Sequence, residues 1–208
     1  MVRSKAPAST SALRGEPVRQ RVLDAAERLL GVGHADFSMR DLAAEAGVSF
    51  ATPFNHFGSK GAIMLALSGR RIEAMAERFA EAPPLPLAWD RVLLATDTAA
   101  RIMLSQPAVN RAMLGWISTA SPSPGRVLAH STALWSLALG AGEGLVSSAR
   151  EEALRCLPQQ LAFAFRGVLS FWAAGELPDD ALAPQARAIA SSLLLGFVER
   201  EAMPNADH

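Results

Sequence analysis

Helical periodicity without any strand-like alternation is the feature that most limits how this 208-residue chain can fold. Ala and Leu dominate the sequence, Tyr is absent, and no segment alternates β-branched with polar residues. Ala and Leu have high helix propensity, and apolar residues recur at intervals of three and four. The sequence therefore predicts an all-α fold.

Capping residues and helix breakers predict where the helices begin and end. Pro17 suits the first turn of a helix that runs to about Leu30, and Ser38 with Asp41 three residues later predicts a capped second helix. Pro158 should kink or divide a helix expected over about 149–174. Further helices are expected after Ser49, Ser59, Pro83–Pro86 and Pro107, near Arg126, and from Asp179 or Asp180, as cap, to about Glu201.

The two parts of the chain differ in charge. Residues 1–71 hold ten Lys and Arg against six Asp and Glu, whereas residues 72–208 hold ten against fourteen. A basic first third on an acidic remainder fits a nucleic-acid-binding head on a larger body.

Several classes of protein are excluded by what the sequence lacks. The single cysteine, Cys156, allows no intrachain disulfide, and the longest strongly apolar stretch without charge, Val127–Gly142, is shorter than the roughly 18 residues that span a membrane. A phosphate-binding Gly-rich loop and the metal-ligand spacings of His or Cys are absent. We expect a cytoplasmic protein that is not an enzyme, has no cofactor or metal, and has no membrane partner.

The segment from Ser38 to Lys60, SMRDLAAEAGVSFATPFNHFGSK, carries the functional signal. It predicts a helix, a short turn at Gly47 and a second short helix, the arrangement in which the second helix enters the DNA major groove. Ala43 and Ala46 are small enough for two helices to cross closely, and Gly47 supplies the positive φ that the turn needs. The segment is therefore a candidate helix-turn-helix.

Residues 19–67 resemble the N-terminal domain of the TetR family of bacterial regulators. The similarity lies in RVLDAAERLL, a loop with glycine, FSMRDLAAEAGVS and the ending T-x-F-x-H-F-x-S-K. With the expected disordered arm over 1–15, the resemblance implies a three-helix DNA-binding domain over 16–62. It also implies a helical ligand-binding and dimerisation domain over 63–208.

The resemblance further implies which residues contact DNA. Phosphate contacts are implied at Ser38, Arg40, Thr52 and Lys60, and a place near the DNA backbone at His56. The part of the recognition helix that meets base edges holds Phe50, Ala51, Pro53 and Asn55, and Ser49 and Phe54 complete the expected DNA-binding set.

Three departures from the family pattern affect these contacts, and the mildest is Ala51, where the family commonly has Gly or a small residue. Phe54 stands where the family commonly has Tyr, so no hydroxyl is available there for a phosphate. Pro53 stands where the family usually has a different apolar residue, and a proline biases the preceding Thr52 away from helical dihedrals. This favours a recognition helix that begins at Pro53 with Thr52 as its cap, which would shift the side chains that reach the bases.

Bulky apolar residues in the body offer walls for a ligand cavity between helices, although ordinary core packing is the alternative for each residue taken singly. Asp97 and Arg101 are four residues apart and are expected to pair on the outer face. The expected ligand is therefore small, apolar and mostly uncharged. The residues expected to bind it are Trp89, Leu93, Thr96, Met103, Met113, Trp116, His130 and Trp135.

The last two helices carry apolar residues around most of their circumference, so both of their sides should be buried. The expected second partner is the same helix pair of another subunit, which the resemblance also implies. The residues expected in this homodimer interface are Leu161, Phe165, Val168, Trp172, Ile189, Leu193, Gly196 and Phe197.

These observations together predict a homodimeric transcriptional regulator, more a repressor than an activator, that a small apolar effector releases from an inverted-repeat operator. The alternative is a helical ligand-binding protein or enzyme whose helix-turn-helix no longer binds DNA, which the departures at positions 53 and 54 favour. Salt-dependent retention on DNA separates the two, because phosphate contacts release counterions.

Overall fold

The structure, a computed structural model, describes residues 10–117 and 124–198. Within these ranges the chain forms nine α-helices and no strand, apart from one isolated bridge between Leu145 and Val198. The predicted all-α fold is confirmed. The helices are α1 (Thr10–Gly31), α2 (Met39–Glu45), α3 (Ala51–Phe57), α4 (Lys60–Ala80), α5 (Ala88–Ser105), α6 (Pro107–Ile117), α7 (Arg126–Leu139), α8 (Arg150–Ala173) and α9 (Asp179–Leu194).

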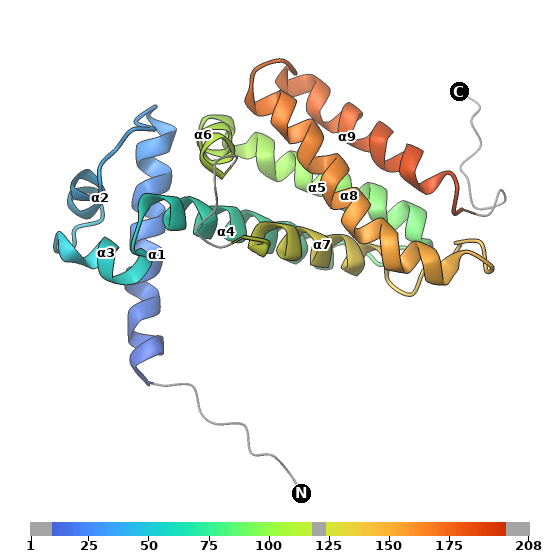
Figure 1. The fold of residues 1–208 in the computed structure, drawn as a ribbon, viewed down its shortest axis with the longest axis horizontal. Coiled ribbons are helices and arrows are strands. Elements are labelled where there is room, and N and C mark those ends of the chain that lie inside the picture. Colours follow the sequence, from blue (N-terminus) through green and yellow to red (C-terminus); the bar gives the residue numbers. More distant parts are fainter. Residues whose placement is uncertain (1–9, 118–123, 199–208) are drawn as a thin grey trace, which may run out of the picture.

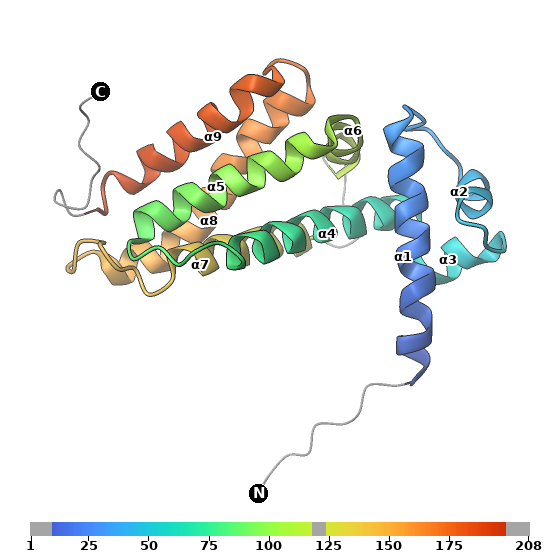
Figure 2. The ribbon, with the colours of Figure 1, turned by 180° about the vertical axis from the view of Figure 1, so that it is seen from behind.

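Helix α4 joins a small N-terminal lobe to a larger helical body (Figure 1). The lobe consists of α1, α2 and α3 around the first turns of α4, and α1 crosses α4 steeply. In the body, α4 and α7 lie side by side, α5 packs against both, α8 packs against α7, and α9 covers α5 and α8 (Figure 2). Helix α6 lies between the lobe and the body and contacts α1, α4 and α8.

Local hydrogen bonds explain where α2 and α4 begin. The Ser38 hydroxyl accepts a hydrogen bond from the Asp41 N–H at 3.2 Å, and the Asp41 carboxylate accepts one from the Ser38 N–H at 2.8 Å. This is the predicted capping box. At the start of α4, the Ser59 hydroxyl accepts from the Ala62 N–H at 3.2 Å. Between α2 and α3, Gly47 has the predicted positive φ, 62°.

Two other predicted boundaries differ from the structure. Helix α1 begins at Thr10 and continues through Pro17, so it includes residues 10–15 of the arm predicted to be disordered, while residues 1–9 lie outside the described residues. Helix α8 runs through Pro158, so the helix is not divided there, and the alternative of a kink stays a prediction.

The predicted cap of the last helix is wrong. Pro178 is the N-cap residue of α9 and makes no side-chain cap bond. The Asp179 carboxylate instead accepts hydrogen bonds from Trp172 Nε1 and from Arg111, both at 2.7 Å. Helix α9 ends at Leu194, earlier than predicted.

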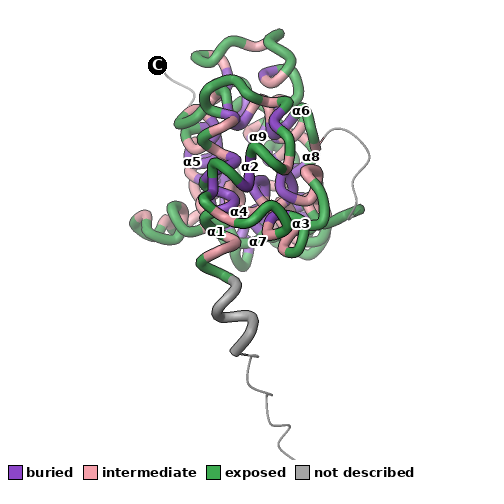
Figure 3. The backbone as a smooth tube through the Cα atoms, turned by 90° about the vertical axis from the view of Figure 1, so that its left-hand side faces the viewer, coloured by how far each residue is buried: buried purple, intermediate pink, exposed green. Residues whose placement is uncertain are grey.

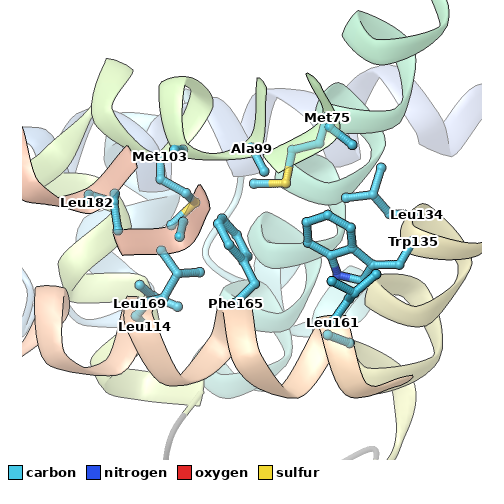
Figure 4. Close-up of a cluster of buried hydrophobic side chains, with 14 of the residues drawn as sticks. Met75, Ala99, Met103, Leu114, Leu134, Trp135, Leu161, Phe165, Leu169 and Leu182 are labelled. Carbon is cyan, nitrogen blue, oxygen red and sulfur yellow. The ribbon is translucent and has the colours of Figure 1, made fainter. Parts of the chain in front are cut away.

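One continuous apolar core extends through the lobe and the body. In the body, Met75 of α4, Met103 of α5 and Phe165 of α8 point toward a common centre (Figure 4). The rings of Trp135 and Phe165 meet edge to face with their centroids 5.6 Å apart. In the lobe, Leu42 of α2 belongs to the same cluster. The lobe is therefore packed onto the body through side chains and is not merely tethered to it.

Gly47→Ala should lower the free energy of unfolding by about 1 kcal/mol, because a Cβ strains the backbone at positive φ. No atom lies within 4 Å of the added Cβ, so the cost is conformational. Urea unfolding at a fixed protein concentration measures it. The control is Gly115→Ala, which also adds a Cβ in open space but lies inside α6, where alanine is the better helix former. Equal destabilisation by both substitutions would contradict the assigned strain.

Candidate nucleic-acid interface and ligand cavity

Several residues of α2 and α3 are exposed on the surface of the lobe (Figure 3), and their side chains are of types suited to DNA contact. Phe50 and Phe54 expose 54% and 43% of their surface, and their rings meet edge to face with centroids 5.6 Å apart. Ala51 and Asn55 are exposed on α3. The Arg40 guanidinium of α2 lies 5.5 Å from the Phe50 ring centroid. The lobe thus exposes an aromatic pair with a guanidinium near it, and an amide on the same helix as Phe54.

Pro53 is buried, which contradicts its predicted place among the base-contacting residues. Helix α3 begins at Ala51, so the prediction that it starts at Pro53 with Thr52 as its cap is also wrong. The Thr52 and Ser49 hydroxyl oxygens lie 2.7 Å apart, and the Thr52 N–H donates to the Ser49 carbonyl at 2.9 Å. Pro53 is the third residue of the helix, where a backbone N–H has no intrahelical partner to lose.

Contacts with α1 fix the position of α3. Arg19 of α1 donates from its guanidinium to the His56 carbonyl at 3.2 Å and lies 4.3 Å from the Phe57 ring centroid. The His56 side chain is half-buried. The His56 carbonyl therefore contacts α1, and the His56 side chain is less exposed than that of Asn55.

Ser38 and Asp41 use their polar groups within the first turn of α2. The two side chains are hydrogen-bonded at 2.8 Å, in addition to the bonds of the capping box. The hydrogen bonds from the Ser38 backbone and then its hydroxyl lower the pKa of the Asp41 carboxyl. Arg40, between them in sequence, is exposed. Of the two phosphate ligands predicted here, Arg40 has the more available side chain.

The Lys60 ammonium makes contacts within the protein. Its Nζ donates to the carbonyls of Ala35 and Phe37, both at 2.8 Å, and lies 4.1 Å from the Phe37 ring and 4.8 Å from the Trp116 ring. Burial lowers the pKa of this ammonium despite nearby carboxylates. Lys60, predicted as a phosphate ligand, therefore joins the loop before α2 to the start of α4 and to α6.

A cavity of about 280 Å³ lies in the body between α4, α5, α6, α7 and α8. Its wall is mostly Met, Leu, Ile, Val and Phe, with two arginines and two serines. The lining residues are Ser68, Arg71, Ile72, Met75, Met103, Met113, Leu114, Ile117, Val127, Leu128, Ser131, Leu134, Ala162, Phe163, Phe165, Arg166 and Leu169.

Of the residues predicted to bind a ligand, the structure brings only Met103 and Met113 to this cavity. Trp89, Leu93, Thr96 and Trp135 are buried in the core but do not line it. The Thr96 hydroxyl donates to the Val92 carbonyl at 2.8 Å. Trp116 is next to Lys60, and His130 lines a separate surface groove between α4 and α7. Helical periodicity placed Trp89, Leu93, Thr96 and Met103 on one face of a helix, and all four are buried, but it could not separate core from cavity wall.

The two cavity arginines were missed by the sequence analysis. Arg71 of α4 donates to Asn110 Oδ1 at 2.9 Å and to Gln106 Oε1 at 2.8 Å, both near or on α6, and pairs with Glu27 of α1 at 3.2 Å. Burial lowers the pKa of Arg71 and of Arg166. Arg71 thus contacts the cavity, α6 and the DNA-binding lobe with one side chain.

The charged pair predicted to lie outside the cavity is also different, since Asp97 pairs with Arg187 at 2.6 Å and not with Arg101.

The outer face of α8 and α9 carries an exposed apolar stripe. Phe163 and Phe171 of α8 expose 51% and 59% of their surface, and Ile189 of α9 and Leu195 just after it are also exposed. The predicted interface residues divide between two faces. Leu161, Phe165 and Trp172 are buried inside the protomer, Val168, Leu193 and Phe197 are half-buried, and Ile189 and Gly196 are exposed. Leu161, Phe165 and Trp172 face the protomer core and are not available to another subunit.

In the described part of the chain, no group of three or more His, Cys, Asp or Glu side chains could hold a metal ion. Among the same residues, no helix combines the length and apolar character that crossing a bilayer requires.

The fold and this surface define a helix-turn-helix DNA-binding transcriptional regulator. A family model described as bacterial regulatory proteins, tetR family, matches residues 22–67. A TetR transcriptional regulator from Rhodococcus sp. RHA1 is 25% identical, with 86% of this chain and 97% of that chain covered and a TM-score of 0.70. Residues 22–67 are therefore similar to the TetR family of bacterial regulators, and the chain shares the fold of a TetR transcriptional regulator.

Two further solved structures share the fold. PfmR from Thermus thermophilus is 20% identical, with 88% of this chain and 97% of that chain covered and a TM-score of 0.52. AlkX from Dietzia sp., a TetR family repressor implicated in biodegradation of n-alkanes, is 20% identical, with 84% and 94% covered and a TM-score of 0.53. A comparison with curated proteins gave no match.

Lys60→Ala should lower the free energy of unfolding by about 1–2 kcal/mol in the absence of DNA, because two charge-assisted hydrogen bonds are lost. Urea unfolding measures the change. The control is Arg40→Ala, which removes an exposed cation and should change stability by less than about 0.5 kcal/mol. An unchanged stability of Lys60→Ala would contradict the structural role of this ammonium.

Proposed function

We propose that the chain is a homodimeric repressor that binds an inverted-repeat operator and leaves it when a small, largely apolar effector occupies the cavity. The observation that carries the proposal is the surface of Arg40, Phe50, Phe54 and Asn55 on a helix-turn-helix. An amide at the major groove can read base edges, and an exposed guanidinium of the same lobe can bind phosphate.

The exposed stripe on α8 and α9 supports a dimer. Phe163, Gly167 and Phe171 follow one another at intervals of four residues and are all exposed. Apolar side chains on one helix face are stabilised when a second surface covers them. A two-fold related copy presents the same stripe, and a two-fold dimer suits an inverted-repeat operator.

The cavity and its contacts support control by an effector. Helix α4 forms part of the cavity wall with Met75 and bears Lys60 at its other end, beside the loop that precedes α2. A ligand that shifts α4 therefore changes the position of the lobe. Because the two binding sites are coupled through one free energy, the effector and the operator should weaken each other's binding equally.

The proposal is tested by selecting bound sequences from random duplex DNA. We expect an inverted repeat whose half-sites are separated by about 34–36 Å or a multiple of that distance, bound with an affinity that falls steeply with salt. If no duplex is retained at low salt, the chain is instead a helical ligand-binding protein with a helix-turn-helix that no longer binds DNA.

Replacing one thymine of a selected half-site by deoxyuridine should weaken binding about fourfold if its methyl group contacts the Phe50–Phe54 pair. One buried methyl is worth about 0.8 kcal/mol, and 1.4 kcal/mol is tenfold. Fluorescence anisotropy of labelled operators measures the ratio. The variant Phe50→Ala/Phe54→Ala should not distinguish thymine from uracil at that position, whereas Asn55→Ala should keep the distinction. A wild-type protein indifferent to every such replacement would show that the aromatic pair does not read methyl groups.

Phe171→Glu should convert the dimer to a folded monomer. The side chain is exposed in the protomer, so the carboxylate is desolvated only when a partner covers it. Sedimentation at micromolar concentration gives the mass, and circular dichroism checks the helical content. Val32→Glu places the same charge on an exposed apolar site in the lobe and should remain dimeric. A dimeric Phe171→Glu protein, or a monomeric wild type, would contradict the proposed interface.

A further inference from the structure

The charge on the cavity wall is entirely of one sign. Arg71 and Arg166 line the cavity, and no Asp or Glu is present among the described residues that surround it. The rest of the wall is apolar except for Ser68 and Ser131. The charged groups that the wall offers a ligand are therefore guanidinium groups alone, so an acidic group on the ligand is complementary to the wall.

The carboxylate that forms an ion pair with Arg71 belongs to a residue outside the cavity. Glu27 of α1 lies 3.2 Å from Arg71 and 3.3 Å from Arg70, so one carboxylate is shared by two guanidinium groups. Arg70 has a second acid in Asp24, at 2.7 Å. Another anion can therefore replace Glu27 as the partner of Arg71, because Glu27 retains Arg70 as a partner.

We propose that the effector is a small amphiphile, an apolar molecule bearing a single acidic group, whose anion binds at Arg71 and Arg166 and competes with Glu27 for Arg71. This inference rests on the proposed function of the cavity and specifies its ligand. The Met, Leu and Phe side chains bind the apolar part of the molecule. Guanidinium groups bind carboxylate, sulfonate or phosphate oxygens through charge-assisted hydrogen bonds.

The size of the cavity limits the amphiphile. At about 280 Å³ it lies near the lower end of the roughly 300–1,000 Å³ typical of small-molecule sites. Two or three rings or a chain of moderate length would fill it.

Competition for Arg71 also explains how binding of the effector in the body would affect the DNA-binding lobe. Arg71 on α4 joins α1 through Glu27 and lies close to α6 through Asn110. When the anion takes Arg71, the pair of Arg71 with Glu27 is lost, whereas Arg70 of α4 keeps its pairs with Glu27 and Asp24 of α1 and the core contacts remain. The effector then loosens the lobe relative to α4 without unfolding it.

The inference is tested with two probes that share one scaffold, 8-anilinonaphthalene-1-sulfonate and N-phenyl-1-naphthylamine. Both fluoresce in apolar surroundings, and only the first carries an anion. A purely apolar cavity prefers the uncharged amine, because the sulfonate is better hydrated in water. We expect the full-length wild-type protein to bind the sulfonate at least about tenfold more tightly than the amine.

Variants show whether the cavity arginines cause this preference. Arg166→Gln should reduce the preference for the sulfonate over the amine below about twofold. Arg71→Gln should have the same effect, and thermal unfolding checks that this variant is folded. The matched control is Arg101→Gln, which removes an exposed cation of α5 outside the cavity and should keep the preference. Equal binding of both probes by the wild type, binding of neither, or a preference that survives Arg166→Gln overturns the inference.

The competition is tested by removing the rival carboxylate. Glu27→Gln should bind the sulfonate several-fold more tightly than the wild type and the uncharged amine with unchanged affinity. Asp24→Asn is the control, because Asp24 pairs with Arg70 and not with Arg71. Unchanged sulfonate binding by Glu27→Gln would overturn the competition. None of these measurements uses DNA, so a failure of operator binding and a failure of the ligand inference are distinguishable.

Discussion

The burial of α4 in both the lobe and the body is the constraint on which the rest of the structure depends. Its first turns bury Ile63, Met64 and Leu67, and a later turn buries Met75 beside Ala99 of α5 (Figure 4). A fully buried side chain of this kind contributes roughly 1.5–3 kcal/mol. Because one rigid helix contributes to the packing of both parts, the lobe cannot change its orientation without some repacking in the body.

The features that could be predicted from the sequence are those whose partners lie close along the chain. Ser38 and Asp41 are three residues apart, as are Ser59 and Ala62, so the starts of α2 and α4 could be predicted from the spacing. The φ of Gly47 follows from its place between two short helices. For the same reason the helix-turn-helix could be recognised before its surroundings were known.

The features that could not be predicted depend on residues distant in sequence. In α8, Phe165 and Phe163 are equally apolar, and only the neighbouring helices decide that the first is buried and the second exposed. Pro53 and Lys60 turn inward because the lobe offers them contacts from other segments. The charge of the cavity wall comes from Arg71 and Arg166, on two helices far apart in sequence. No local pattern distinguishes such residues from ordinary surface arginines.

Phe163 belongs to two surfaces at once, the wall of the cavity and the exposed stripe of α8. A neighbouring subunit seated on that stripe covers the outer side of its ring and becomes part of the barrier around the bound molecule. The bound molecule then exchanges with solvent only when the subunit contact opens, so the lifetime of that contact limits the rate of exchange. Occupancy and self-association would reinforce each other, so the apparent affinity for the effector would rise with the concentration of the protein itself.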